Sequence, residues 1–527
     1  MAAINVFRDD IGGFRLTLLH LDDDALSLIA SQLLDAPDVA DALRLSLVCK
    51  RLRTIVLSLL FRAVGWPRRN RIEFYPPSLW PFIRYVETDA GKCDFFDAFL
   101  LRRLSFLQVH WRSHHAKALN NLGNALPRLH NLTTFNYSEQ KFGPSLASIS
   151  CLARSSPTLT TLELNTVFFT HDALTSFSEF SGLHRLLLKQ PEGTTLLTAP
   201  KSKRTLSLQC VSNLVLACRE TLSYLEIPGE FCPLEAFATA STKLSSLKAL
   251  VLHGYPPLDT EIPIWKIFPS MPQLSRLDLL FKLRVIGARL SRYVVMPCEA
   301  PIVPGDASVF PSHLETLSIA NPMMRDRMFT NLPPSLKSLT LDFVPEWENV
   351  LSKDSLAYHR PETMLKFLNS MRKKGSASLP FLASFCMKTG WCATPEILAC
   401  IRRAFPNLTF LELQGLRYVN RAEALSDMDG CVSSLSDLQS LRTIKLAMEL
   451  PEDAYKDSLS AERTVGSVEQ ATRRWAETLA LRLTNLQFLA FETRPRVGRG
   501  LGQRIQPTQL NWVWFDVRGG IAKHRHG

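Results

Sequence analysis

A short apolar phrase recurs along most of the chain and constrains its fold more than any other feature. The phrase has Leu first, an apolar residue three positions later and another two positions after that. Nine clear copies begin at Leu159, Leu183, Leu222, Leu247, Leu274, Leu314, Leu336, Leu408 and Leu441. Four looser copies begin at Leu104, Leu132, Leu382 and Leu486. Successive copies often start 22 to 28 residues apart, which predicts a regular array of similar units.

Each copy predicts a short strand followed by a return segment, because residues two apart in a strand point to the same face. One such unit cannot bury its apolar face, whereas stacked units bury a continuous core. The phrase is similar to the leucine-rich repeat, and this resemblance implies strands that line a curved sheet. Asn165 is the nearest match to the asparagine usual later in that repeat, so the repeats are degenerate. An ordinary α/β domain yields a few such phrases by chance, but not thirteen in order.

Three stretches interrupt the array. Residues 285–312 contain four prolines and predict a surface loop. Residues 344–378 contain an amphipathic segment around Met364 and Leu368, and residues 451–483 predict a long inserted helix pair. Insertions into a solenoid lie on one face, which is often the binding face.

The segment 19–64 holds three apolar helical patterns in 46 residues. Asp22, Asp23 and Asp24 stand where helix N-caps and first turns favour acids, and residues 35–37 end the first pattern. A unit this small cannot easily close a stable core alone, so its apolar faces need a partner. On periodicity alone, an ordinary helical cap on a larger fold is an equal alternative.

The residue identities in this segment resemble an F-box. The resemblance lies in the opening at 21–24, the Ile29 to Leu34 helix end, the helix from Leu43 to Leu47, the run at 48–51 and the close at 59–62. Asp22 stands where the family usually has proline. F-boxes bind the Skp adaptor of SCF (cullin–RING) ubiquitin ligases, which the resemblance implies here. The apolar residues expected to pack the F-box or contact the adaptor are Leu21, Leu26, Ile29, Leu33, Leu43, Leu47, Val48, Leu59 and Leu60. The sequence does not separate the two roles.

Composition sets wider bounds. The chain has 527 residues, 46% of them hydrophobic, enough for more than one domain and a large core. We find no run of eighteen apolar residues and no secretory signal, so we expect no membrane span. The eleven scattered cysteines predict a reducing compartment, cytosolic or nuclear, rather than a disulfide framework.

Motifs for catalysis or metal binding have poor spacing. Cys386, Cys392 and Cys400 lie too far apart for the tight pairs of structural zinc sites. The histidines at 110–115 lack a second ligand pair, and the glycines at 498–502 lack a following helix. We therefore expect no catalytic residue, no metal and no cofactor, and we expect the cysteines to be buried hydrophobes.

The net charge of +12 raises nucleic-acid binding as a possibility, but the excess is spread along the chain. Arginines cluster only at 494–504, where they form either a site for an acidic group or a solvated tail. We expect neither a nucleic acid nor a membrane as partner. Trp512, Trp514 and Phe515 predict a cap for the last repeat.

Substrate specificity is expected at exposed strand positions between and just after the repeat leucines. The acidic and polar residues at these positions are Glu163, Asn165, Glu226, Asp278, Asp342, Glu412 and Glu492. The basic residues on or beside them are Arg185, Lys189, Arg276, Lys388 and Lys445. The face is therefore mixed in sign and predicts neither an acidic nor a basic ligand.

The predicted fold is an α/β solenoid, with a three-helix F-box before an irregular leucine-rich-repeat horseshoe that carries inserted loops and helices. The predicted boundaries are a leader at 1–18, the F-box at 19–64, a linker or cap at 65–100, the repeats at 101–493 and a basic tail and cap at 494–527.

The expected function is a non-catalytic receptor that docks the Skp adaptor and, through it, a cullin–RING ligase, while the repeats hold a protein substrate. The alternative is a leucine-rich interaction scaffold outside ubiquitin transfer. No group of residues in the sequence supports an enzymatic function. The sequence does not name the substrate.

Overall fold

The computed structural model describes residues 21–35, 40–66, 77–89, 126, 129, 131–138, 152–154, 156–164, 173–189, 200–239, 243–257, 262–286, 289–291, 293–296, 310–324, 326–343, 361–373, 379–389, 393–415, 428–447, 461–493 and 511–525. The chain divides into two compact units, Met1–Leu183 (unit 1) and His184–Gly527 (unit 2). Each is described by itself.

Unit 1 begins with helices and continues with parallel strands. The described helices are α1 (Asp23–Asp35), α2 (Ala40–Ser46), α3 (Lys50–Leu60) and the short α7 (Ala173–Phe177), with a 3-10 helix η2 (Pro77–Phe82). The strands are β1 (Ala63–Trp66), β2 (Tyr85–Asp89), β3 (Thr134–Ser138) and β4 (Thr161–Leu164). They pair in chain order, each parallel to the next.

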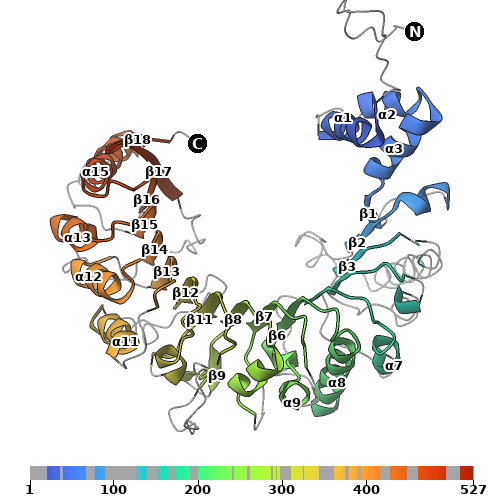
Figure 1. Cartoon of the computed structure of the whole chain (residues 1–527), viewed down its shortest axis with the longest axis horizontal. Helices are drawn as coiled ribbons and strands as arrows, with labels where there is room; N and C mark the ends of the chain where they lie inside the picture. Colours follow the sequence, from blue (N-terminus) through green and yellow to red (C-terminus); the bar gives the residue numbers. More distant parts are fainter. Residues whose placement is uncertain are drawn as a thin grey trace, which may run out of the picture. The chain divides into compact units, whose positions relative to one another are not determined.

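Unit 2 contains a longer parallel sheet whose strands also follow chain order (Figure 1). Its parallel strands are β5 (Arg185–Leu188), β6 (Tyr224–Pro228), β7 (Ala249–Gly254), β8 (Arg276–Phe281), β11 (Thr316–Ala320), β12 (Ser338–Asp342), β13 (Ser384–Thr389), β14 (Phe410–Gly415), β15 (Thr443–Ala447) and β16 (Phe488–Thr493). Neighbours in space are therefore neighbours in sequence, an order compatible with a solenoid.

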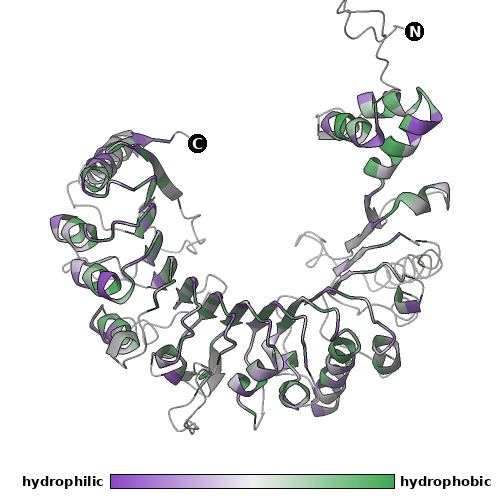
Figure 2. Cartoon of the chain, viewed as in Figure 1, coloured by the Kyte–Doolittle hydropathy of each residue, from purple (hydrophilic) through white to green (hydrophobic). Residues whose placement is uncertain are grey.

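Helices return the chain from one strand to the next on one side of this sheet (Figure 1). They are α8 (Lys201–Ala217), η6 (Gly229–Phe231), α9 (Leu234–Ala238), η7 (Ile264–Ser270), η8 (Arg327–Thr330), α11 (Pro361–Lys373), α12 (Pro395–Ala404), α13 (Met428–Leu435) and α15 (Ala461–Arg482). Apolar residues of these helices face the strands and hydrophilic residues face outward, as Figure 2 shows.

The repeat phrase supplies the core of unit 2. In each parallel strand the second and fourth residues are apolar and at most 4% exposed, as with Leu250 and Leu252 in β7. The first leucine of each phrase, such as Leu247, lies in the turn before the strand and is also buried. Three apolar positions per repeat thus build the core, and each buried leucine contributes about 1.5–3 kcal/mol.

Polar residues in the turns bind each repeat to the one before it. The residue before the first leucine donates a hydrogen bond to a carbonyl of the preceding repeat, from Ser246 Oγ to Glu220 O at 2.7 Å and from Ser335 Oγ to Leu314 O at 2.8 Å. Asn407 and Asn485 do the same with their side-chain amides. A serine or asparagine directly before the first leucine therefore links these neighbouring repeats, in turns with and without proline.

The last two strands of the sheet in unit 2 are antiparallel, unlike the parallel strands before them. β17 (Asn511–Arg518) pairs with β16 in the antiparallel direction, and β18 (Ile521–His524) pairs antiparallel with β17. Gly519 and Gly520 form the tight connection, both with positive φ, which glycine adopts without a steric penalty. This hairpin contains Trp512, Trp514 and Phe515, where the sequence predicts a cap.

Two of the three predicted insertions differ from expectation. The predicted surface loop at 285–312 overlaps a two-stranded ribbon, β9 (Arg284–Ile286) with β10 (Arg289–Ser291), and buries Val295 and Met296. The predicted helix pair at 451–483 is a single helix, α15, within its described part. The amphipathic segment around Met364 and Leu368 is confirmed as helix α11.

Asp326 holds the buried part of the first insertion. Its carboxylate accepts hydrogen bonds from the backbone N–H groups of Val295 at 2.5 Å, Met296 at 3.0 Å and Met328 at 3.0 Å. Burial raises the pKa of this carboxyl to about 6, while the three N–H donors act in the opposite direction. Polar anchoring therefore brings Val295 and Met296 into a core that proline content alone would not predict.

Gly229 lies where the backbone of one repeat packs closely against its neighbours. A Cβ there would lie 2.5 Å from Cε1 of Phe281 and 2.5 Å from the carbonyl oxygen of Tyr255. We predict that Gly229→Ala lowers the free energy of unfolding by about 1–3 kcal/mol through overpacking. Gly182→Ala is the control, since its Cβ would meet nothing closer than 3.8 Å. Urea unfolding of the full chain compares the two, and an unchanged Gly229→Ala midpoint would contradict the prediction.

A second prediction concerns pH. Since the folded-state pKa of Asp326 is raised above 3.8 to about 6, this carboxyl stabilises the fold most below pH 3.8 and loses that contribution as pH rises through 6. The difference amounts to about 3 kcal/mol. Between pH 4 and 7, the unfolding free energy of the wild type should fall relative to that of Asp326→Asn. If the difference in unfolding free energy between the wild type and Asp326→Asn did not change with pH, the prediction would be wrong.

Candidate functional site

Two of the three N-terminal helices, α1 and α3, begin directly after a capping side chain. Asp22 accepts a hydrogen bond from the backbone N–H of Ala25 at 2.7 Å, so it caps α1 as the acidic opening predicts. Cys49 caps α3, where its Sγ accepts from the N–H of Leu52 at 3.4 Å. These local bonds help to define where α1 and α3 begin.

Arg51 ties the start of α3 to the start of α1. Its Nε donates to the Asp23 carboxylate at 2.8 Å and its Nη2 donates to the carbonyl of Leu21, also at 2.8 Å. Both side chains are largely exposed, so the ion pair contributes little energy, about 0–1 kcal/mol. The pair nevertheless connects the start of α3 to the start of α1 through two hydrogen bonds.

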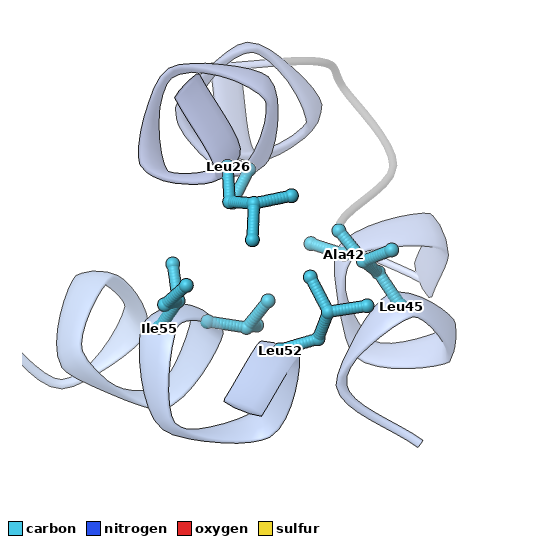
Figure 3. Close-up of a cluster of buried hydrophobic side chains, with 7 residues drawn as sticks. Leu26, Ala42, Leu45, Leu52 and Ile55 are labelled. Carbon is cyan, nitrogen blue, oxygen red and sulfur yellow. The ribbon is translucent and has the colours of Figure 1, made fainter. Parts of the chain in front are cut away.

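The helices share a small core of their own (Figure 3). Its side chains point to the centre of the three helices, and they are Leu26, Ala30, Ala42, Leu45, Leu52, Ile55 and Val56. Two of the seven are alanines, so the helices approach closely but bury modest area. The prediction of three helices in this segment is confirmed, with α2 ending at Ser46 rather than running through Leu47 and Val48.

Large apolar side chains also reach solvent on these helices. Leu47 is 80% exposed, Val48 57% and Leu43 49%, and all three lie on or just after α2. We call these three residues the α2 patch. Leu28 on α1 is 64% exposed as well. Within the described residues nine large hydrophobic side chains are exposed, and four of them belong to this segment.

The structure separates the apolar residues that the sequence leaves unsorted. Leu26 belongs to the core. The residues that are half-buried against that core are Leu21, Leu33, Leu59 and Leu60. Ile29 is half-buried, and Leu43, Leu47 and Val48 are exposed. Sequence reasoning missed Leu28, which lies off the i, i+3, i+4 stripe of α1; an off-stripe leucine is the signal that would have found it.

The candidate substrate residues lie on the strands, but most are not exposed. Asp278, Asp342, Glu412 and Glu492 are buried, which corrects the expectation of exposed positions. Glu163 and Glu226 are half-buried. Asn165 lies outside the described residues, as do Cys392, the histidines at 110–115, the glycines at 498–502 and the arginines at 494–504.

Ion pairs explain this burial. Arg276 binds Asp278 at 2.6 Å, Lys445 binds Glu412 at 3.2 Å and Lys388 binds Asp342 at 3.5 Å. The Oε2 of Glu492 accepts from the backbone N–H of Gly415 at 3.3 Å. Alternation correctly assigns these acids to the sheet face away from the leucines, but it does not show how deeply neighbouring side chains cover them.

Two aromatic clusters on this face were not predicted. Tyr224 donates a hydrogen bond to Glu226 at 2.8 Å and lies under the guanidinium of Arg185, 4.6 Å from the ring centroid. Lys445 lies 5.6 and 5.2 Å from the ring centroids of Trp512 and Trp514. The second cluster depends on the antiparallel hairpin, so the repeat pattern gives no signal for it.

The described residues can be compared with the requirements of metal binding and of a reactive thiol. No group of three or more His, Cys, Asp or Glu residues suited to hold a metal ion occurs among them. Burial raises the pKa of Cys210 and of Cys386 to about 12, so these thiols stay protonated and are poor nucleophiles at neutral pH. None of the described helices has both the length and the apolar character needed to cross a membrane.

Comparison with known proteins adds little to this geometry. No protein-family model matches the chain, and no curated protein matches it. Among solved structures, the crystal structure of the Rad7 and Elc1 complex in yeast contains a similar chain, with a TM-score of 0.31 and 13% sequence identity. The match covers 81% of this chain and 88% of that chain. A similarity of this size carries no argument about fold or function.

The contrast between core and α2 patch predicts opposite effects on stability. Leu52→Ala removes a fully buried side chain and should lower the free energy of unfolding by about 2–5 kcal/mol. Leu47→Ser removes a side chain that is 80% exposed and should change it by about 0.5 kcal/mol or less. Circular dichroism during thermal unfolding, together with hydrogen exchange, measures the change in stability of each variant. Equal losses of stability in the two variants would contradict the assignment of Leu52 to the core and of Leu47 to the α2 patch.

Proposed function

We propose that this chain is the substrate receptor of an SCF-type (cullin–RING) E3 ubiquitin ligase. In this proposal α1–α3 form an F-box that binds a Skp-type adaptor, and the parallel repeats are degenerate leucine-rich repeats that bind a protein substrate. The receptor has no catalytic residue and no cofactor of its own, and it acts in the cytoplasm or nucleus.

The α2 patch is the observation that carries the proposal. Exposed leucine and valine side chains on a small helical unit leave apolar area in water, which costs about 25 cal/mol per Å² until a partner covers it. The α1–α3 core is small, so these side chains are not needed to close it. The F-box resemblance lies on the same residues, Leu43, Leu47 and Val48.

The mechanism that follows is proximity. A receptor that binds the adaptor with one surface and the substrate with another makes ubiquitin transfer effectively intramolecular. The gain comes from effective concentration and orientation at the substrate lysine, for which no acid, base or nucleophile of the receptor is required.

Co-purification of the full chain with a Skp-type adaptor tests the proposal. We expect the wild type to retain the adaptor, and Leu43→Asp and Leu47→Asp to weaken binding at least about tenfold because a buried interface would enclose an unpaired carboxylate. Leu26→Asp is unsuitable, since Leu26 lies in the core and its loss would unfold the helices.

The matched control is Phe381→Asp in unit 2, where an equally apolar side chain is 64% exposed. This variant should retain the adaptor. Failure of the wild type to bind any Skp-type adaptor would reject the ligase function and leave the alternative, a leucine-rich interaction scaffold with no part in ubiquitin transfer.

A further inference from the structure

The open face of unit 2 is the side of its sheet away from the leucine columns. It comprises the first, third and fifth residues of the parallel strands β5–β16, which alternate with the buried second and fourth residues. Its cationic side chains are Arg185, Arg276, Lys388 and Lys445, together with Lys189 directly after β5. Its carboxylates are Glu226, Asp278, Asp342, Glu412 and Glu492. By count the face is neutral.

The carboxylates of this face are more deeply buried than its cationic side chains, so the charge that reaches solvent is not neutral. Four of the five carboxylates are buried, and Glu226 is half-buried. Arg185, Lys189 and Arg276 are exposed, and none of the five cationic residues is buried. The side chain of Arg276 is 53% exposed while that of its partner Asp278 is 3% exposed. Solvent therefore meets the positive ends of these pairs.

The difference in side-chain length explains why the acidic groups are more buried than the basic ones. Arginine and lysine carry long apolar stems that lie over neighbouring groups while the charged head stays near water. Aspartate and glutamate are shorter, so in the pairs Arg276–Asp278, Lys388–Asp342 and Lys445–Glu412 the carboxylate lies underneath. Each pair is thus a dipole with its positive end outward.

The positive charge is most exposed over β5–β8. Arg185 and Arg276 lie in the same register row, separated by Tyr224 on β6 and Ala249 on β7. Both act electrostatically on the Tyr224 hydroxyl, whose pKa is raised to about 12 mainly by burial and by its bond to Glu226. Within the described part of the chain, Arg185 stacks on Tyr224 and forms no salt bridge. Its planar guanidinium is therefore held in place with donors available.

We propose that the substrate bound by the open face is an acidic polypeptide segment whose carboxylates pair with Arg185 and Arg276 across β5–β8. This inference rests on the proposed receptor function and names its substrate class. Charge complementarity selects the occupant, because a basic segment would meet exposed guanidinium groups. A nucleic acid fits less well, since Tyr224 and Ala249 separate Arg185 from Arg276 and the row lacks the continuous basic stripe that a run of phosphates requires.

Fluorescence anisotropy of the full chain with a labelled peptide of ten glutamates tests the proposal. We expect salt-sensitive binding of this probe and no binding of a ten-lysine peptide. Arg185→Gln should weaken binding about fivefold and Arg185→Glu about tenfold or more. Arg185 is the preferred position, because Arg276→Gln would also leave the buried Asp278 without its partner.

Arg482 provides the matched control, since it is exposed in the last turn of α15, on the helical side. Arg482→Glu changes the net charge by the same amount as Arg185→Glu, and it should leave binding within about twofold. Equal losses in the two variants would show non-specific attraction to a basic protein and overturn the proposal. Absence of glutamate-peptide binding would also overturn the proposal. So would binding of a ten-nucleotide oligo(dT) that depends on Arg185 and is tighter than binding of the glutamate peptide.

The experiments can reject either proposal without rejecting the other. The peptide assay contains no adaptor, so loss of adaptor binding in Leu47→Asp leaves the acidic-segment result unchanged. Conversely, Arg185→Glu should retain the Skp-type adaptor fully. A chain that binds the glutamate peptide but no adaptor would keep the binding face and reject the ligase function.

Discussion

The buried columns of leucine are the constraint on which unit 2 depends. Each parallel strand contributes two apolar residues to them and each preceding turn contributes a third. No single repeat buries these residues without its neighbours, so the strands must stack in chain order. The open face then carries the remaining positions, which are free to vary in chemistry without loss of the core. Binding residues and core residues thus occupy alternate positions of the same strands.

Much of this arrangement could be predicted from the sequence, because spacing alone determines which residues share a face. The phrases at Leu247 and Leu274 predicted strands that the structure contains as β7 and β8. Burial depth on the open face could not be predicted: Asp278 is covered by Arg276, a residue on its own strand, and Asp342 by Lys388 on the next. These contacts depend on rotamers and register, which the repeat pattern does not encode.

The N-terminal helices show the same limit in another form. Periodicity identified their apolar residues, yet Leu26 and Leu47 look alike in sequence and have opposite fates. The difference arises because α2 ends at Ser46, so Leu47 and Val48 lie in the turn beyond it and leave the core. A two-residue change in where a helix ends therefore decides whether two apolar residues, whose role the sequence left open, pack in the core or lie in water. That small shift separates a self-contained bundle from one that presents apolar area to water.

The antiparallel hairpin at the end of unit 2 limits how this protein can grow. Parallel arrays lengthen by tandem duplication, since each new copy presents the same edge as the last. β17 runs against β16, and its other edge is taken by β18, a strand of four residues. A repeat added after β18 would meet a strand of only four residues, whereas one gained internally would pair with a parallel strand on both sides. We therefore expect changes in array length to arise at interior positions, which leave β16 paired with the terminal hairpin.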